Sequence, residues 1–353
     1  SERIFGNGTT RTHWKEIIPQ PTKVMVIGVA RFAVKVFKDS SAGVPVSAWV
    51  YPQDSTKGFY DYALAPAIVK WFSTYIGPYP YKKLANVQSK TIFGGMENAS
   101  AIFYAENTVT GTRKSEALLA HEIAHQWFGN TATEKSFAHL WLSEGFATYL
   151  THLYMRSRFG QDSFMKRLQE DRSEVAAFAP RYKNPVVDTT SNLMNLLNPN
   201  SYQKGGWVLY LLNRRLGDSL FQKTVQTYYA SYSGRNADSK DFENVAEQVS
   251  GQILDSFFQQ WIYTPGIPQI NAGWTMQPNG QLELNVQQYS KTTYQIPLVI
   301  GFRYKNKPLE KRTFQLTKAA ESFLIDVPEK PVQLVLDPDT ELLFEGRIQE
   351  VRR

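Results

Sequence analysis

The chain has 353 residues, of which 42% are hydrophobic, 14% aromatic and 20% charged. This is a globular composition, which excludes a disordered chain, collagen and a coiled coil. Because the chain has no cysteine, disulfides, thiolate metal sites and a cysteine nucleophile are excluded too, which leaves His, carboxylates, Ser, Tyr or Lys for chemistry. The net charge is +7, but the lysines and arginines are scattered among 32 acidic residues. We therefore expect no nucleic-acid partner.

No segment of the sequence is long and apolar enough to cross a membrane. The longest mostly apolar stretch, residues 24–34, is interrupted by Arg31 and is shorter than the roughly 20 residues that a membrane helix needs. Residues 1–8 show no basic region followed by an apolar one, so no targeting segment is predicted. We therefore expect a soluble chain, and its composition indicates no compartment.

The elements predicted first along the chain are mainly extended. Stretches rich in valine, isoleucine and phenylalanine are typical of strands, and a turn at 40–43 separates the first two. A helical spacing of apolar residues follows, and Gly77 with Pro78 would end that helix. The elements expected in this part are strands at 23–37 and 44–51, a helix at 61–76 and an extended segment at 83–93.

The middle of the chain is predicted to be helical and its end to be β structure. Two strong amphipathic helices are expected at 115–128 and 136–158. After residue 268 apolar residues alternate with polar ones, and Asn279-Gly280 is a typical hairpin turn. Further helices are expected at 206–216, 219–232, 241–249 and 255–262, followed by a small all-β domain at 269–353.

Two histidines bracket a glutamate inside the first strong helix. In His121-Glu122-Ile123-Ala124-His125 the i, i+4 spacing places both imidazoles on one helix face. Two imidazoles supply half of a tetrahedral zinc site, so a third protein ligand is required.

The favoured third ligand is Glu144, which eighteen residues separate from His125 and which lies on the second strong helix. A histidine six residues after His125 would be another choice, but that position holds Thr131. His139 is a less favoured alternative. Two His and one Glu leave a fourth position for water, which is typical of a catalytic zinc and not of a structural one. The three other histidines, His13, His139 and His152, are expected to be ordinary surface residues.

Glu122 lies beside these ligands without being one of them. Zinc lowers the pKa of a bound water toward about 7, and a neighbouring carboxylate can take its proton as the water attacks a carbonyl. The same carboxylate can then pass a proton to a leaving amine. This arrangement predicts amide hydrolysis.

These motifs resemble the gluzincin zinc aminopeptidase family, which includes alanyl aminopeptidase and the leukotriene hydrolase. The resemblance rests on the HExxH motif at 121–125 with Glu144, on the GGMEN motif at 94–98 and on a tyrosine motif at 201–205. It implies an α+β fold. In that fold residues 1–46 are the last strands of an N-terminal β domain, residues 47–268 a mainly helical, thermolysin-like catalytic domain, and residues 269–353 a small β-sandwich.

The resemblance also implies roles for individual residues. Glu97 would bind the free α-amine of the substrate, and the Tyr202 hydroxyl would stabilise the tetrahedral oxyanion. A carboxylate beside the scissile bond is a charge-assisted partner for an ammonium, so the enzyme would require a free N-terminus. The substrate-binding residues implied are Gly94, Gly95, Met96, Glu97 and Asn98, of which the first three would pair with the peptide backbone.

The sequence departs from the family pattern in two ways. Many relatives carry a second acid seven residues after the glutamate ligand, where this chain has Thr151. Such outer partners change metal affinity or activity by about 10- to 100-fold. The sequence also lacks most of an N-terminal β domain and a C-terminal helical domain. We therefore expect a fragment or part of a larger protein, which is less active alone than its full-length parent.

The favoured hypothesis is a monomeric aminopeptidase with one Zn²⁺ per chain, acting on peptides with a free N-terminus. A zinc endopeptidase is less favoured because the GGMEN motif would supply an anchor for an amine. An epoxide hydrolase is a remote alternative. A catalytically silent peptide- or protein-binding module on the same fold is the alternative from another functional class.

Overall fold

The computed structural model describes residues 2–4, 7, 9–39 and 41–351. The chain divides into two compact units, the first formed by residues 1–133 and 229–237, the second by residues 134–228 and 238–353. Helices and sheets occur in both, which confirms the predicted α+β class. The domain boundaries after residues 46 and 268 remain predictions from the sequence. Within the described ranges, no helix is long and apolar enough to cross a membrane.

The first unit is built on a five-stranded mixed sheet with the order β3-β4-β5-β7-β6. The three inner strands run parallel, and β3 and β6 run antiparallel to their neighbours at the two edges. Short strands β1 (Glu2–Ile4) and β2 (Thr10–Thr12) pair separately. The sheet consists of β3 (Ala33–Val36), β4 (Val46–Val50), β5 (Leu84–Ser89), β6 (Gly95–Met96) and β7 (Ala101–Ala105).

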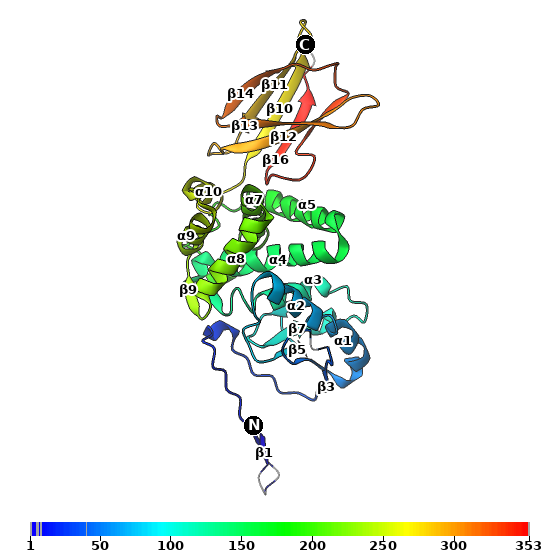
Figure 1. The fold of residues 1–353 in the computed structure, drawn as a ribbon, viewed down its shortest axis with the longest axis vertical. Coiled ribbons are helices and arrows are strands. Elements are labelled where there is room, and N and C mark those ends of the chain that lie inside the picture. The colour runs from blue at the N-terminus through cyan, green and yellow to red at the C-terminus, as the bar shows by residue number, and fades with distance from the viewer. Residues whose placement is uncertain (1, 5–6, 8, 40, 352–353) are drawn as a thin grey trace. The chain divides into compact units, whose positions relative to one another are not determined.

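Helices lie beside this sheet in the first unit (Figure 1), and aromatic and small residues form the contacts between them. Tyr62 contacts Tyr104 of β7 with ring centroids 5.3 Å apart, and Gly58 lies against Val50 of β4. Both tyrosines are fully buried, so burial of their apolar surface is what holds helix and sheet together. The helices are α1 (Ser55–Tyr62), α2 (Ala65–Tyr75) and α3 (Glu116–Ala124), with 3₁₀ turns at Thr22–Val24, Pro52–Asp54 and Glu106–Thr108. The short strands β8 (Ala132–Glu134) and β9 (Arg235–Ala237) form a further pair.

The second unit is helical in its first part and β in its second. Helix α4 is buried from Trp141 to Met155 on every face, and this burial includes its polar residues Ser143, Glu144, Thr148, Thr151 and His152. The helices are α4 (Trp141–Phe159), α5 (Gln161–Phe178), α6 (Leu193–Leu196), the π-helical turn η5 (Asn200–Lys204), α7 (Gly205–Leu216), α8 (Asp218–Tyr232), α9 (Ser239–Ser250) and α10 (Asp255–Trp261), preceded by a 3₁₀ turn at Phe137–His139.

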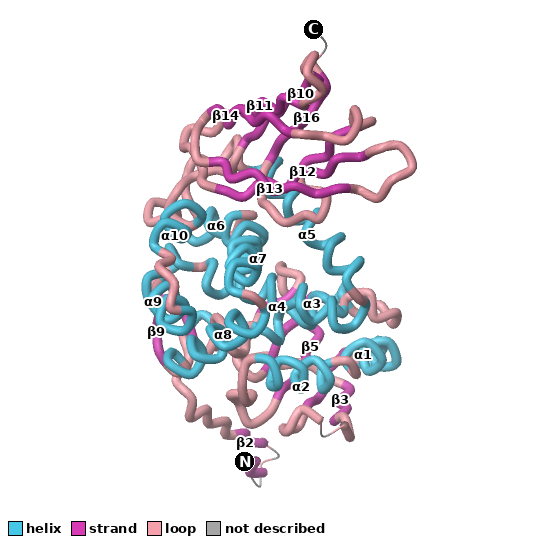
Figure 2. Tube along the Cα trace, turned by 45° about the horizontal axis from the view of Figure 1, so that its top comes forward, coloured by secondary structure: helices cyan, strands magenta, loops and turns pink. Residues whose placement is uncertain are grey.

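The predicted all-β region is confirmed as two facing sheets (Figure 2). Their orders are β14-β11-β10-β16 and β13-β12-β15. Leu282, Leu284 and Val286 of β11 are buried and alternate with more exposed residues, as a half-buried strand requires. The strands are β10 (Gln269–Met276), β11 (Leu282–Gln288), β12 (Ile296–Arg303), β13 (Glu310–Leu316), β14 (Ala320–Ile325), β15 (Gln333–Leu336) and β16 (Glu345–Glu350).

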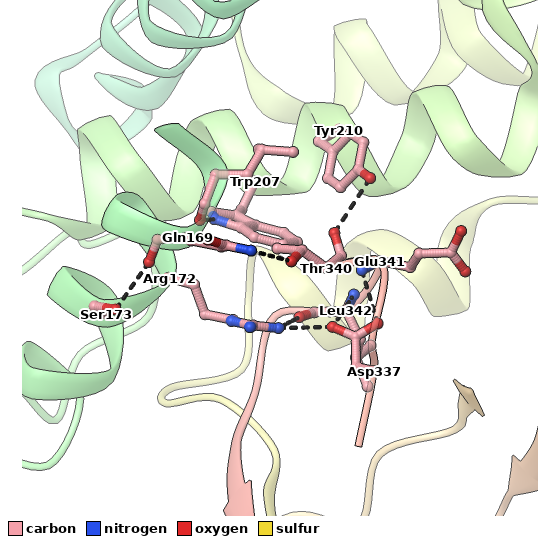
Figure 3. Close-up of polar contacts among 10 residues, drawn as sticks. Gln169, Arg172, Ser173, Trp207, Tyr210, Asp337, Thr340, Glu341 and Leu342 are labelled. Atoms are coloured by element: carbon pink, nitrogen blue, oxygen red, sulfur yellow. Dashed lines mark hydrogen bonds and ion pairs between the residues drawn. The ribbon is translucent and has the colours of Figure 1, made fainter. Parts of the chain in front are cut away.

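A polar cluster ties the loop after β15 to α5 (Figure 3). The buried Asp337 carboxylate accepts a 2.6 Å hydrogen bond from Arg172 of α5 and bonds from the backbone N–H groups of Glu341 and Leu342. Burial raises the pKa of Asp337, and Arg172 together with these amides opposes that rise. The carboxylate is thus paired and hydrogen-bonded, as a buried charge must be.

Three helix predictions and one strand prediction need correction at their boundaries. The strand expected at 23–37 is a strand only at Ala33–Val36, and its expected start falls in the 3₁₀ turn at Thr22–Val24. The helix expected at 136–158 begins only at Trp141, after the 3₁₀ turn at Phe137–His139. The helix expected at 61–76 is in fact the end of α1 followed by α2, because Pro66 stands in the first turn of α2 and cannot continue a helix from α1. The helix expected at 115–128 is regular only from Glu116 to Ala124. The turn predicted at 40–43 falls partly on Ser40, which lies outside the described residues.

Candidate active site

Helix α3 presents His121 and His125 toward one point. Their Nε2 atoms are 3.1 Å apart, and their rings are nearly perpendicular, with centroids separated by 4.7 Å. Two nitrogens bound to one tetrahedral zinc at about 2.0–2.1 Å stand about 3.3 Å apart. The pair therefore has the spacing that a shared metal ion requires.

The orientation of His125 is fixed by a backbone carbonyl. Its Nδ1 lies 3.0 Å from the carbonyl oxygen of Phe128, three residues further along the chain. Because a carbonyl can only accept, Nδ1 carries the proton in this contact and Nε2 keeps a lone pair for a metal. The carbonyl thus fixes the tautomer and ring orientation of His125, as a carboxylate behind the ligand does in other metal sites.

Glu144 is the third member of the candidate metal group. It lies in the first turn of α4 and is buried. One ligand atom from each of His121, His125 and Glu144 lies within 4.8 Å of the others, a group that could hold a metal ion. Two imidazoles and one carboxylate form the donor set of a catalytic zinc, so the residues present fit that ion.

Glu122 and the GGMEN segment lie against each other within the first unit. Glu122 is buried, and a Cβ atom built on Gly95 would stand 2.4 Å from its Oε1 atom. Any side chain at position 95 would therefore force the Glu122 carboxylate to move. Gly95 belongs to β6, which is an edge strand of its sheet, and an edge strand can pair with an extended peptide.

The backbone around Glu97 is held by two residues that the sequence reasoning missed. Gln126 Nε2 and Asn130 Nδ2 both donate to the Glu97 carbonyl oxygen, at 2.9 and 2.7 Å. Gln126 also accepts from the Ser100 backbone N–H at 2.8 Å. Both residues closely follow the histidine motif, and that proximity is the only sequence signal that could have indicated them. Glu97 itself is 9% exposed.

Tyr202 lies on the turn η5, immediately before α7. The turn is π-helical, a geometry that is rare and often found at functional sites. Its neighbours hold it by side-chain bonds, since Ser201 Oγ donates to the Leu196 carbonyl at 2.7 Å and Asn200 Nδ2 donates to the Asn184 carbonyl at 3.2 Å.

The remaining histidines were only partly predicted. His13 is exposed, as expected. His152 is buried instead, with Nε2 2.7 Å from Asp171 Oδ2, and the surface prediction is wrong for it because α4 is buried all round. His139 is half-buried against Ser239, and burial lowers its pKa. Thr151, which replaces the acid of many relatives, is buried, and its Oγ1 has no hydrogen-bond partner within the described part of the chain.

Comparison with known proteins decides the family. Residues 60–261, more than half of the chain, match the Peptidase family M1 domain. The chain belongs to peptidase family M1. The predicted resemblance to gluzincin aminopeptidases is thereby confirmed.

Individual M1 relatives are similar along most of this chain. Probable aminopeptidase 2 of Sulfurisphaera tokodaii is 26% identical over 340 residues, which cover 90% of this chain and 42% of that protein. Aminopeptidase M1-D of Oryza sativa subsp. japonica is 32% identical over 209 residues, or 55% of this chain and 24% of that protein. The crystal structure of Legionella pneumophila aminopeptidase A in complex with aspartic acid matches with a TM-score of 0.84 at 16% identity, covering 99% of this chain and 42% of that one, which shows a shared fold. The chain thus spans less than half the length of these relatives.

Proposed function

We propose that this chain is a zinc-dependent aminopeptidase that removes the N-terminal residue from peptides with a free α-amine. The observation that carries the proposal is the group formed by His121, His125 and Glu144, with Glu122 beside the ligands and against the GGMEN strand. Its membership in peptidase family M1 and its relatives named as aminopeptidases agree with this activity.

The proposed chemistry centres on Glu122. Zinc held by the two histidines and Glu144 would polarise the scissile carbonyl and lower the pKa of a bound water. The Glu122 carboxylate accepts the proton of the attacking water and delivers it to the nitrogen of the leaving peptide, so that no net proton is consumed.

The remaining proposed residues select and orient the substrate. The β6 edge pairs with the peptide backbone, and Glu97 forms a charge-assisted hydrogen bond with the α-ammonium. Gln126 and Asn130 support this role because their bonds to the Glu97 carbonyl fix the backbone that carries the carboxylate. The Tyr202 hydroxyl donates to the oxyanion that forms on the carbonyl oxygen.

Elemental analysis together with hydrolysis assays tests the proposal. We expect one zinc per chain in the wild type and in Glu122→Gln, with hydrolysis of aminoacyl amides nearly abolished in the variant. Loss of metal from Glu122→Gln, or its retention in a His121→Ala and His125→Ala double variant, would contradict the ligand assignment. Equal cleavage of N-acetylated peptides would indicate an endopeptidase instead.

A further inference from the structure

Lys204 is a buried cation that the proposed mechanism does not use. It ends the π-helical turn η5, two residues after Tyr202, and is 1% exposed. Its Nζ donates to the carbonyl oxygen of Gly266 at 2.7 Å and approaches that of Thr264 at 3.5 Å. Burial lowers the pKa of Lys204 to about 7.

The burial of Lys204 costs free energy that a side chain with only a packing role would avoid. A buried ammonium loses its hydration. Desolvation is the only cause of its lowered pKa, with no compensating acid, and no carboxylate within the described ranges forms an ion pair with it. An apolar side chain of similar length would fill the same volume without this cost. What only the lysine provides is a donor that reaches the 264–266 backbone.

The two ends of this contact belong to different parts of the second unit. Residues 264–266 connect α10 to β10, the first strand of the β-sandwich. Lys204 belongs to the turn that carries Tyr202, and 62 residues separate it from Gly266 along the chain. The hydrogen bond therefore ties the Tyr202 turn to the segment that leads into the sandwich.

A backbone contact also holds the end of the turn. Gly205, the next residue after Lys204, meets Gly145 of α4 so closely that a Cβ on Gly145 would stand 2.8 Å from the Gly205 carbonyl carbon. Gly145 directly follows Glu144. The turn is thus held beside the proposed metal ligand by this backbone contact, and Lys204 is the side chain that ties it to the 264–266 segment.

We propose that Lys204 is a positioning residue for Tyr202, which holds the tyrosine turn against the 264–266 segment so that the hydroxyl stays at a fixed place. The inference rests on the proposed function, in which Tyr202 is the oxyanion donor. If the turn is not held, the hydroxyl no longer keeps one position, and a misplacement of about 1 Å can lower the rate by about 10²-fold. Substrate binding is left unchanged because neither residue is proposed to bind the peptide's amine or backbone.

A spectroscopic experiment tests the positioning without relying on activity. Tyr202 is replaced by 3-fluorotyrosine in the zinc-loaded protein, and its ¹⁹F resonance is recorded with Lys204 and with Lys204→Met, which keeps the length and volume but removes the donor. We expect one narrow resonance in the first case and a shifted or broadened one in the second. Lys204→Gln, which is too short to reach Gly266, is a second variant in case the methionine variant does not fold, with the same expected change.

Lys83 provides the matched control. Lys83 is half-buried, its Nζ likewise donates to a backbone carbonyl, that of Ser100 at 2.9 Å, and burial likewise lowers its pKa. Lys83→Met should leave the Tyr202 resonance unchanged. An unchanged resonance in Lys204→Met, or an equal change in both variants, overturns the proposal.

A kinetic experiment tests the consequence for catalysis. In an active wild type, Lys204→Met should lower kcat by at least about tenfold, with KM within about twofold and zinc content unchanged. In a Tyr202→Phe background the same substitution should change kcat by less than about twofold, because the hydroxyl it positions is already gone. A full additional loss in that background, or a normal kcat in Lys204→Met alone, overturns the proposal. If the wild type hydrolyses no aminoacyl amide, the proposed function fails, and the ¹⁹F comparison alone decides the placement of Lys204.

Discussion

Substitution of Gly145 by alanine is the sharpest test of how α4 and α7 are held together. In an exposed helix the change would stabilise the protein, since alanine is favoured over glycine by about 1 kcal/mol. Here the new Cβ would stand 2.8 Å from the carbonyl carbon and 2.9 Å from the Cα of Gly205. Both are backbone atoms of α7, so no side-chain rotation relieves the clash.

The structure sets the size of the expected effect. Carbon atoms pack at about 3.5–4.0 Å, so the two helices must separate by at least about 0.7 Å. Overpacking of this kind costs about 1–3 kcal/mol, which the helix preference of alanine reduces to a net loss of about 0–2 kcal/mol. The effect on activity should be larger, because Glu144 precedes Gly145 and a displacement near 1 Å can cost about 10²-fold.

Urea unfolding and steady-state kinetics on the same preparations measure both quantities. Gly206→Ala is the control, since its Cβ would meet the Thr148 Cγ2 methyl at 3.0 Å instead of backbone. We expect a smaller loss there, and its recovery when Thr148→Ala removes the methyl. A Gly145→Ala variant with wild-type stability and activity, or one no worse than Gly206→Ala, would refute the view that backbone contact sets the helix distance.

Three further predictions follow from named contacts. Tyr202→Phe should lower kcat by about 10²- to 10³-fold with little change in KM, as expected for an oxyanion donor worth about 2.7–4 kcal/mol; a kcat loss below threefold would make Tyr202 a core residue. Glu97→Ala and N-acetylation of the substrate should each lower kcat/KM at least about tenfold and should not add in a double-mutant cycle, whereas additive losses would remove Glu97 from the amine site. Arg172→Met should destabilise the protein by about 3–5 kcal/mol at pH 7, because it leaves the buried Asp337 carboxylate without its cation. Burial already raises the pKa of Asp337, so the folded variant binds a proton more tightly than the unfolded chain. The loss in free energy of unfolding, measured with urea, should therefore shrink as the pH falls from 7 toward 4. A loss that does not depend on pH would show that the carboxylate is not its cause.

The parts of the site that were predictable from sequence are those that local geometry determines. The i, i+4 spacing of His121 and His125 places both rings together in any α-helix, and their Nε2 atoms do converge. The buried alternation of Leu282, Leu284 and Val286 follows in the same way from the two-residue period of a strand. Such patterns depend only on residues close together in the chain, so they can be recognised from a single sequence.

The parts that only the tertiary structure decided depend on contacts between distant segments. The bond from Asn130 to the Glu97 carbonyl spans 33 residues, and the bond from Lys204 to the Gly266 carbonyl spans 62. In the sequence Gly145 and Gly205 are ordinary helix glycines. Their importance comes from the close approach of the α4 and α7 backbones at these two residues. His152 likewise has the sequence context of an exposed residue and is buried because α4 is enclosed on every face. Which side chains meet is decided by the packing of whole elements, and the energy of that packing is shared among contacts that no local pattern records.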